Sequence, residues 1–291
     1  MRFERIAAEK ANYPVNLMCQ QMSVSRSGFY AWLRRTPSER QKRDVVLLHE
    51  IRSVHLEMRR AYGSPRICRE LNRRGCRVGR HRVARLMRKA NLVGRKKAVR
   101  RFRVWDEPSV PAVDLVQRRF EVAGPNTVWV GDFTYLPASE GFYFLSVLMD
   151  LYSRRIVGWA VSDRLDTDLA LEALHGALLT RSPKQGLIHH TDRGSQYGSR
   201  AYRTALLAHG IRPSMSRPGN CWDNAVVESF FATLKAEWDL DHPLVSLEEA
   251  RARLFDYIET FYNQRRLHSR LGFTTPASFE MKSMERNQQL A

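Results

Sequence analysis

Asp132 lies in a sequence context where a carboxylate is unexpected. The run 128–136 reads as a strand in which alternate residues share one face, and Asp132 shares its face with Val130 and Thr134. A charged side chain on an apolar strand is costly unless it is paired or bound to a cation. Asp132 is therefore a candidate metal ligand or catalytic acid.

Asp192 follows the short apolar run 187–190, which reads as another strand. Open α/β sheets bind their ligands beyond such strand ends, so Asp192 is a second candidate. A plain turn residue is the alternative interpretation, because Asp before Arg-Gly favours a turn.

Glu228 and Lys235 lie on a helix expected to begin near Asp223. At 100° per residue, Val227 and Phe230 fall on the core side, while Glu228 and Lys235 point together in another direction. The alternative interpretation of both residues is an ordinary solvated helix face.

Three acids without a neighbouring His or Cys suit hard cations such as Mg²⁺ or Mn²⁺. Two such ions can hold the attacking and leaving oxygens of an in-line phosphoryl displacement. The expected chemistry is therefore phosphoryl transfer with two ions per active site, with water or a hydroxyl group of the substrate as nucleophile and no covalent protein–substrate intermediate.

The elements that must position these residues follow from the hydrophobic periodicity of the second half of the chain. Strands are expected at 128–136, 142–152, 155–161, 187–190 and 211–215. Helices are expected at 169–179, 202–209, from 223 onward and at 247–265. This order predicts an α/β domain with a mixed five-stranded sheet.

The first half of the chain reads as helices around tight turns, with helix-turn-helix candidates at 14–35 and 65–92. The last of these helices combines an apolar stripe with four arginines that are candidate DNA contacts: Arg80, Arg82, Arg85 and Arg88. Arginine can read guanine edges or hold phosphates, and both roles stay open here. An ordinary helical hairpin with a basic surface is the alternative.

A basic, proline-containing stretch at 93–125 interrupts the helical pattern. It is expected to lie along DNA phosphates through Arg95, Lys96, Lys97, Arg100 and Arg101. A merely flexible tether is the alternative. The predicted division of the chain is 1–60 for a helical region with the first helix-turn-helix, 61–92 for the second, 93–125 for the linker and 126–291 for the catalytic core with a C-terminal helical extension.

The charge of the chain is concentrated in its first third. Of the 291 residues, 1–105 hold 28 Lys and Arg against 7 Asp and Glu, a net +21, whereas 106–291 hold 20 against 23, a net −3. A polyanionic partner such as DNA is expected, with a solvated set of arginine-rich helices as the alternative.

Cysteine usage and hydropathy bear on the cellular setting. The four cysteines form no C-x-x-C pair, which argues against a structural zinc site and favours a reducing, cytoplasmic location. The longest apolar run, 142–149, is too short to span a bilayer, and the N-terminus does not read as a signal peptide. No membrane association is expected.

Four motifs together resemble one known family. They are 129–136 (WVGDFTYL), 190–197 (HTDRGSQY), 223–231 (DNAVVESFF) and 262–269 (YNQRRLHS), with 35 residues between Asp192 and Glu228. This pattern is similar to the integrase-core transposases of bacterial insertion sequences, the OrfB products of copy-and-paste elements related to retroviral integrases. The match runs over nearly the whole chain. Gly131 departs from the hydroxyl residue more usual before the first Asp, but a side chain there would face away from the acid.

The resemblance implies an RNase H-like core in which Asp132, Asp192 and Glu228 form the DDE triad and Lys235 contacts the terminal DNA of the element. It also implies double-stranded DNA partners, namely element ends and target, a dimer or larger oligomer, fusion to an upstream frame product, and residence on the bacterial nucleoid.

The function predicted is a DNA transposase that cleaves and joins strands in a metal-dependent reaction. A catalytically idle DNA-binding regulator and an RNase H-type nuclease are the alternatives. The intact acids disfavour the regulator, and the basic helix-turn-helix half disfavours a nonspecific nuclease. The terminal repeat recognised and the preferred target do not follow from the sequence.

Overall fold

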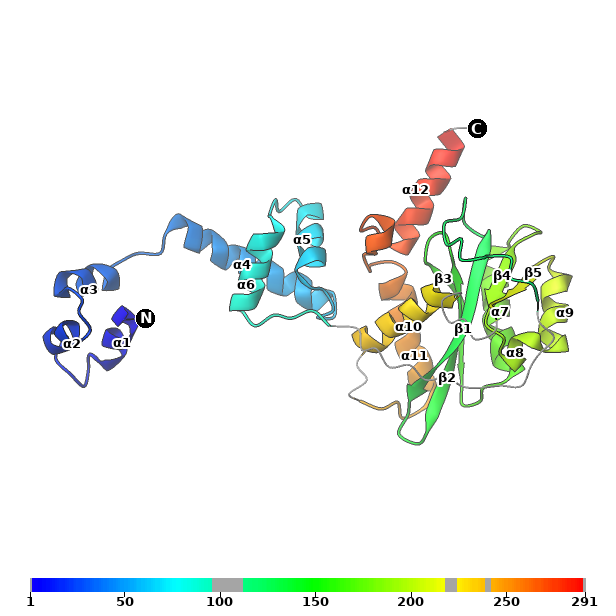
Figure 1. Cartoon of the computed structure of the whole chain (residues 1–291), viewed down its shortest axis with the longest axis horizontal. Helices are drawn as coiled ribbons and strands as arrows, with labels where there is room; N and C mark the ends of the chain where they lie inside the picture. The colour runs from blue at the N-terminus through cyan, green and yellow to red at the C-terminus, as the bar shows by residue number, and fades with distance from the viewer. Residues whose placement is uncertain (1, 96–111, 218–223, 239–241, 290–291) are drawn as a thin grey trace.

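The computed structural model describes residues 2–95, 112–217, 224–238 and 242–289. A small helical unit, a second helical unit and an α/β core follow one another along the long axis of the molecule (Figure 1). No helix among these residues is long and apolar enough to cross a membrane.

The first helical unit packs three short helices around Ile6, Cys19 and Phe29. Its members are α1 (Arg2–Glu9), α2 (Val15–Gln21) and α3 (Arg26–Leu33). Ser25 caps α3 by accepting a 3.0 Å hydrogen bond from the Gly28 amide. The two helices expected at 14–35 are therefore present as α2 and α3.

The second helical unit is built on a long helix that the hydrophobic pattern does not single out. Its members are α4 (Glu39–Glu57), α5 (Ser64–Arg73) and α6 (Arg80–Lys89). Ser38 and Gln41 form a reciprocal capping box at the start of α4. Ile51, Ile67 and Val83 are fully buried between the three helices. The expected helix-turn-helix at 65–92 is thus α5 and α6, and α4, which falls within the predicted region 1–60, packs against both.

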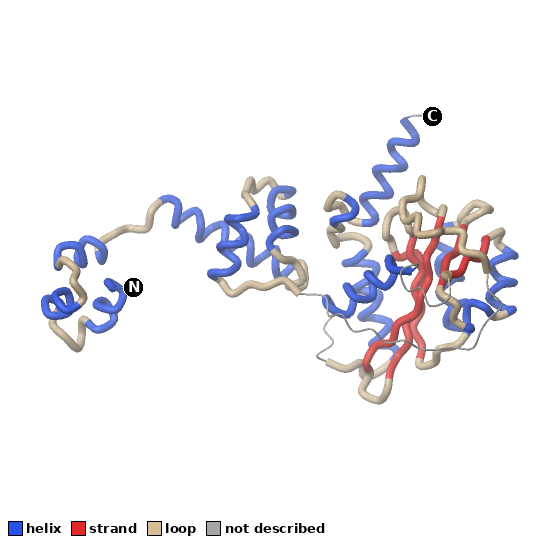
Figure 2. The backbone as a smooth tube through the Cα atoms, in the orientation of Figure 1, coloured by secondary structure: helices blue, strands red, loops and turns tan. Residues whose placement is uncertain are grey.

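The core contains the expected mixed sheet of five strands, in the order β3-β2-β1-β4-β5 (Figure 2). β1 pairs antiparallel with β2 and parallel with β4, and β4 pairs parallel with β5. The strands are β1 (Val128–Pro137), β2 (Phe142–Asp150), β3 (Ile156–Ser162), β4 (Ile188–Thr191) and β5 (Arg212–Met215). The RNase H-like α/β prediction is confirmed, with strand bounds within two residues of those expected.

Helices cover both faces of this sheet. One face packs against α7 (Thr167–Arg181), α8 (Ser195–Gly198) and α9 (Arg200–Ala208). The other packs against α10 (Ala225–Glu237) and α11 (Leu247–Phe255). The chain continues from α11 as the π-helix η2 (Asp256–Tyr262) where a single α-helix was expected. The wider turn of a π-helix accommodates four buried side chains: Tyr257, Ile258, Phe261 and Tyr262.

The second helical unit docks on η2 and the segment after it. Arg59 Nη2 lies 2.7 Å from Asp256 Oδ2. The Tyr62 hydroxyl accepts a 2.7 Å hydrogen bond from the Leu267 amide and donates a 3.3 Å bond to the Arg265 carbonyl. Because these contacts join residues about 200 positions apart in the sequence, the unit and the core share one interface.

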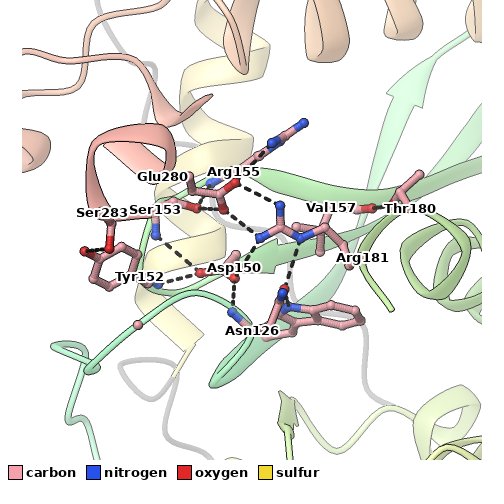
Figure 3. A network of polar contacts seen from close by, with 12 residues as sticks. Asn126, Asp150, Tyr152, Ser153, Arg155, Val157, Thr180, Arg181, Glu280 and Ser283 are labelled. Atoms are coloured by element: carbon pink, nitrogen blue, oxygen red, sulfur yellow. Dashed lines mark hydrogen bonds and ion pairs between the residues drawn. The ribbon is translucent and has the colours of Figure 1, made fainter. Parts of the chain in front are cut away.

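The last helix, α12 (Pro276–Gln289), lies in the predicted C-terminal helical extension, although its own bounds were not predicted. A polar network fastens its first half to the rest of the core (Figure 3). Glu280 accepts hydrogen bonds from Arg181 at 2.8 Å, from Ser153 at 2.7 Å and from Arg155 at 3.0 Å. The Glu280 side chain is 2% exposed. The 3-10 helix η3 (Ser269–Leu271) precedes α12.

Candidate active site

The first candidate carboxylate, Asp132, lies in the middle of the central strand β1. It occupies the face that carries Val130 and packs against α10. The Phe133 amide donates a 2.8 Å hydrogen bond to Asp132 Oδ1. Burial, and then the charges of Asp192 and Glu228, raise the pKa of Asp132 well above its ordinary value. A nearby cation would offset this cost of ionisation.

Asp192 comes directly after β4, the parallel neighbour of β1. Val130 pairs with His190, so two further steps along each strand bring Asp132 and Asp192 to the same face of the sheet. The Gly194 amide donates a 3.0 Å hydrogen bond to Asp192 Oδ1, as in an Asx turn. The turn and the catalytic interpretations are compatible, because the turn orients a carboxylate that stays exposed beside Asp132.

Glu228 comes from the first turn of α10, which crosses β1. Asn224, just before the helix, donates a 3.1 Å hydrogen bond from Nδ2 to the Gly131 carbonyl and so ties α10 to the strand. Val227 and Phe230 are buried, whereas Glu228 is exposed. The prediction that Glu228 lies off the core side of its helix is confirmed.

Lys235 lies two turns further along α10 and is partly buried. Its Nζ is 4.2 Å from the centre of the Tyr135 ring, a cation–π contact. Burial lowers the pKa of Lys235, and the charge of Asp132 acts in the opposite direction. The Lys235 ammonium group and the Asp132 carboxylate therefore influence each other electrostatically.

The donor set is suited to a hard divalent cation. Asp132 is influenced electrostatically by both Asp192 and Glu228, and all three offer carboxylate oxygens. Within the described part of the chain, no three His, Cys, Asp or Glu side chains are arranged closely enough to enclose an ion. The carboxylates fit Mg²⁺ or Mn²⁺ in chemical type, and closing on an ion would require their side chains to move together.

Two integrase-core family models and a helix-turn-helix family model match the chain. "Integrase core domain" matches residues 122–221 and 209–276, and "HTH-like domain" matches residues 42–101. The Transposase InsF for insertion sequence IS3A of Escherichia coli (strain K12) is 38% identical over 293 residues, which cover 98% of this chain and 100% of that relative. The chain belongs to the integrase-core transposases of bacterial insertion sequences.

The chain is also similar to a second relative, the insertion element IS600 uncharacterized 31 kDa protein of Shigella sonnei. It is 42% identical over 268 residues, covering 91% of this chain and 98% of the relative. The HTLV-2 integrase catalytic core domain in complex with magnesium (trimeric form) aligns with a TM-score of 0.43 at 19% identity, over 54% of this chain and 97% of that chain. The transposase assignment rests on the sequence relatives.

A buried polar layer lies on the opposite face of β1 from Asp132. A Cβ atom on Gly131 would come within 2.7 Å of His189 Cε1, so the residue before the first Asp does face away from the acid, as expected. The His189 Nε2 atom is 2.8 Å from the Tyr202 hydroxyl. Burial, and then the charge of His190, lower the pKa of His189 to about 3, so His189 is neutral at physiological pH. Gly131 is therefore explained by the imidazole that fills the space.

The four candidate DNA-contacting arginines of the transposase all lie on α6. Arg80, Arg85 and Arg88 are exposed, and Arg82 is partly buried. Val83, Leu86 and Met87 face the core of the second helical unit. The helix thus has the predicted apolar and basic sides.

Of the five linker residues predicted to contact DNA, the structure describes only Arg95. Its Nη1 donates hydrogen bonds to the Glu237 carbonyl at 3.2 Å and the Trp238 carbonyl at 3.1 Å, at the end of α10. The other predicted linker contacts lie outside the described residues: Lys96, Lys97, Arg100 and Arg101. Arg95 therefore has a structural role that its basic context does not reveal.

Three residues that position the site or the basic helix were not predicted from the sequence. Asn224 anchors α10, Tyr135 supports Lys235, and Asp44 pairs with two arginines of α6. Only Asn224 carries a local signal, because Asn is a frequent residue at the start of a helix. The other two depend on contacts between elements distant in the chain.

Proposed function

We propose that Asp132, Asp192 and Glu228 form the catalytic triad of this DNA transposase. The observation that carries the proposal is geometric: the parallel pairing of β1 with β4 brings Asp132 and Asp192 to one face of the sheet, and the hydrogen bond from Asn224 to the Gly131 carbonyl ties the start of the helix that carries Glu228 to the same strand. Strand β1, the end of β4 and the first turn of α10 each supply one carboxylate. Three acids on separate elements that influence one another make a polyanionic site, which is what a divalent cation requires.

The three carboxylates would hold the Mg²⁺ or Mn²⁺ ions, two per active site. Bound there, the ions supply charge stabilisation for the attacking and leaving oxygens of phosphoryl transfer. The protein's own contribution is orientation. The Phe133 amide fixes Asp132, the Gly194 amide fixes Asp192, and the tie from Asn224 to β1 fixes the start of the helix that carries Glu228.

The substrate proposed is double-stranded DNA, both at the element ends and at the target. Residues 61–92 would recognise the ends through Arg80, Arg82, Arg85 and Arg88, and the linker 93–125 would follow the phosphates. Residues 126–291 would carry the chemistry. Because two ends must be cut and joined together, we expect a dimer or larger assembly on the bacterial nucleoid, with an upstream frame product as an additional or fused partner.

The test replaces each acid with its amide in the full chain: Asp132→Asn, Asp192→Asn and Glu228→Gln. Cleavage of a duplex carrying the element end, and joining of its labelled 3′-hydroxyl to target DNA, are measured in Mg²⁺. Loss of both reactions with end binding retained is expected, and each loss should be nearly complete because the triad acts as a unit. An acid whose variant cleaves at near-normal rate has to leave the triad.

Glu140→Gln is the matched control, because Glu140 is an exposed acid in the turn after β1. It should cleave and join normally. A transposase joins the cut DNA end to a target, whereas a nuclease of the RNase H type only cuts. The joining measurement therefore distinguishes the two.

Lys235 is proposed to contact the terminal DNA next to the cut. Its ammonium group lies over Tyr135, is influenced by Asp132 and is on the helix that carries Glu228. Lys235→Ala should weaken engagement of the element tip by more than it weakens metal binding. A photocrosslinker at position 235 should react with nucleotides at the tip, and crosslinks found only far from the tip would remove Lys235 from the site.

A further inference from the structure

Asp44 on α4 bridges the two central arginines of the basic helix α6. Asp44 Oδ1 lies 2.8 Å from Arg82 Nε, and Oδ2 lies 2.6 Å from Arg85 Nη2. The Asp44 side chain is 14% exposed, whereas the two arginine side chains are 38% and 46% exposed. Hydrogen bonds from Arg85 and then Arg82 hold the pKa of Asp44 below its ordinary value, so Asp44 is ionised at neutral pH. One carboxylate thus orders two guanidinium groups that still reach solvent.

This bridge is not what holds α4 and α6 together. Ile51 and Val83 are fully buried between these helices, and Leu47 and Leu86 are buried beside them. A partly exposed ion pair adds little to stability compared with such packing. The contribution of the Asp44 ion pairs to the stability of the fold is therefore small, and stability does not explain their presence.

The bonding leaves most of each guanidinium available. A guanidinium carries five N–H donors, and Asp44 takes one from each arginine. Among the residues that the structure describes, no protein acceptor bonds to the remaining donors of either arginine. An ordered arginine loses less conformational entropy on binding, because its orientation is fixed beforehand.

The charge of Asp44 has a second consequence. Next to two cations it reduces the local net charge from +2 to +1, which weakens attraction to any phosphate backbone. It does not remove the N–H groups that donate to guanine edges. An acid in this position therefore opposes binding to DNA in general and favours contacts to the correct base.

We propose that Asp44 is a positioning residue that orients Arg82 and Arg85 for reading base edges and so sets the discrimination between cognate and random DNA. This inference rests on the proposed role of α6 in recognition.

The experiment compares Asp44→Asn with Glu57→Gln in the purified full chain. Glu57 is also on α4 and pairs with Arg74 of the second helical unit at 2.7 Å, away from α6, and both variants change the net charge by +1. Affinity is measured for a duplex with the terminal repeat of the chain's own element and for a shuffled duplex of equal composition. We expect Asp44→Asn to reduce the cognate-to-random ratio about tenfold and Glu57→Gln to leave it unchanged.

Arg82→Ala and Arg85→Ala, each with and without Asp44→Asn, complete the set. If Asp44 acts through the arginines, Asp44→Asn should lower the cognate-to-random ratio much less in a chain that already lacks one of these arginines than in the parent chain. Thermal melting of each variant shows whether it folds. If Asp44→Asn melts early, Asp44→Glu, which keeps the charge but displaces the carboxylate, is expected to lower the ratio by a smaller factor.

Three outcomes would overturn the inference. The ratio could stay at the parent value in a folded Asp44 variant. Cognate affinity could rise more than random affinity, which would mean that Asp44 blocks the arginines. The reduction of the ratio could also be equal with and without the arginines. If instead Arg82→Ala and Arg85→Ala themselves leave the ratio unchanged, the proposed recognition role of α6 fails, and the inference fails with it for a visibly different reason.

Discussion

At the scale of single residues, Gly131 shows how a small side chain next to a candidate catalytic acid can be set by the opposite face of the sheet. The strand alternation turns Asp132 toward α10 and position 131 toward His189. His189 is fully enclosed and hydrogen-bonded to Tyr202. A hydroxyl residue at position 131 would therefore collide with the imidazole before it could influence the acid.

Gly131→Ala is expected to destabilise the transposase by about 1–3 kcal/mol, because the added Cβ meets His189 at 2.7 Å in a packed layer. Denaturant unfolding of the parent and the variant measures the difference. Gly176→Ala is the control, since Gly176 lies inside α7 with no atom within 4 Å of its added Cβ. That change should stabilise the protein by about 0.5–1 kcal/mol through helix propensity. Equal stability of the parent and Gly131→Ala would mean that His189 can move away freely.

At the scale of elements, one buried acid of α12, Glu280, attaches this helix to the core. Glu280 accepts hydrogen bonds from Arg181, Arg155 and Ser153, and Arg181 also lies 3.5 Å from Asp150 (Figure 3). The Arg181 side chain is 9% exposed, so these carboxylates compensate a charge that water reaches little. The C-terminal helix is thus fastened electrostatically to α7 and to the turn between β2 and β3.

Glu280→Ala should cost about 3–5 kcal/mol of unfolding free energy, because it leaves Arg181 buried with only part of its pairing. Glu39→Gln is the comparison, since it breaks the exposed pair with Lys42 and should change stability little. Chemical denaturation of both variants tests the contrast. A Glu280→Ala protein as stable as Glu39→Gln would show that α12 does not depend on this network.

At the scale of the whole molecule, positive charge and candidate catalytic acids are segregated. The first 105 residues carry a net +21 and the remainder −3. The second helical unit nevertheless docks on the core through Arg59 and Tyr62, and Arg95 of the following segment bonds to the end of α10. The helical unit that carries the basic helix α6 therefore packs directly against the core that carries the three carboxylates.

Neutralising Lys96, Lys97, Arg100 and Arg101 should flatten the salt dependence of binding to cognate and random DNA together. Each phosphate that the protein no longer neutralises lowers the log–log slope by about 0.9, so four such phosphates would lower it by ~3.6. Affinities across a salt series provide the measurement. Arg95→Ala is the contrasting variant, because its hydrogen bonds to the end of α10 predict a lower melting temperature as its main effect. If the linker variant lost sequence discrimination but kept its salt dependence, the assignment of phosphate neutralisation to the linker and of base recognition to α6 would be wrong.

Local patterns in the sequence predicted the α/β class, the five strands, the helix-turn-helix at α5 and α6, and the positions of Asp132, Asp192 and Glu228 in their elements. These features follow from alternation along strands, from turn chemistry and from helical periodicity, which are local properties of the chain. The parallel pairing of β1 with β4 then brings the first two acids to one face.

The partners that these residues contact depend on how distant segments pack in the folded chain. Three contacts join segments whose pairing the periodicity of the sequence does not indicate. They are the contacts of His189 with Gly131, of Tyr135 with Lys235 and of Asp44 with Arg82. The bounds of α12 within the predicted C-terminal extension did not follow from the sequence for the same reason, since this helix is held by Glu280 and not by a continuous apolar stripe. Burial and ion pairing act between residues that are close in space, so their effects on charge and orientation appear only once the chain is folded.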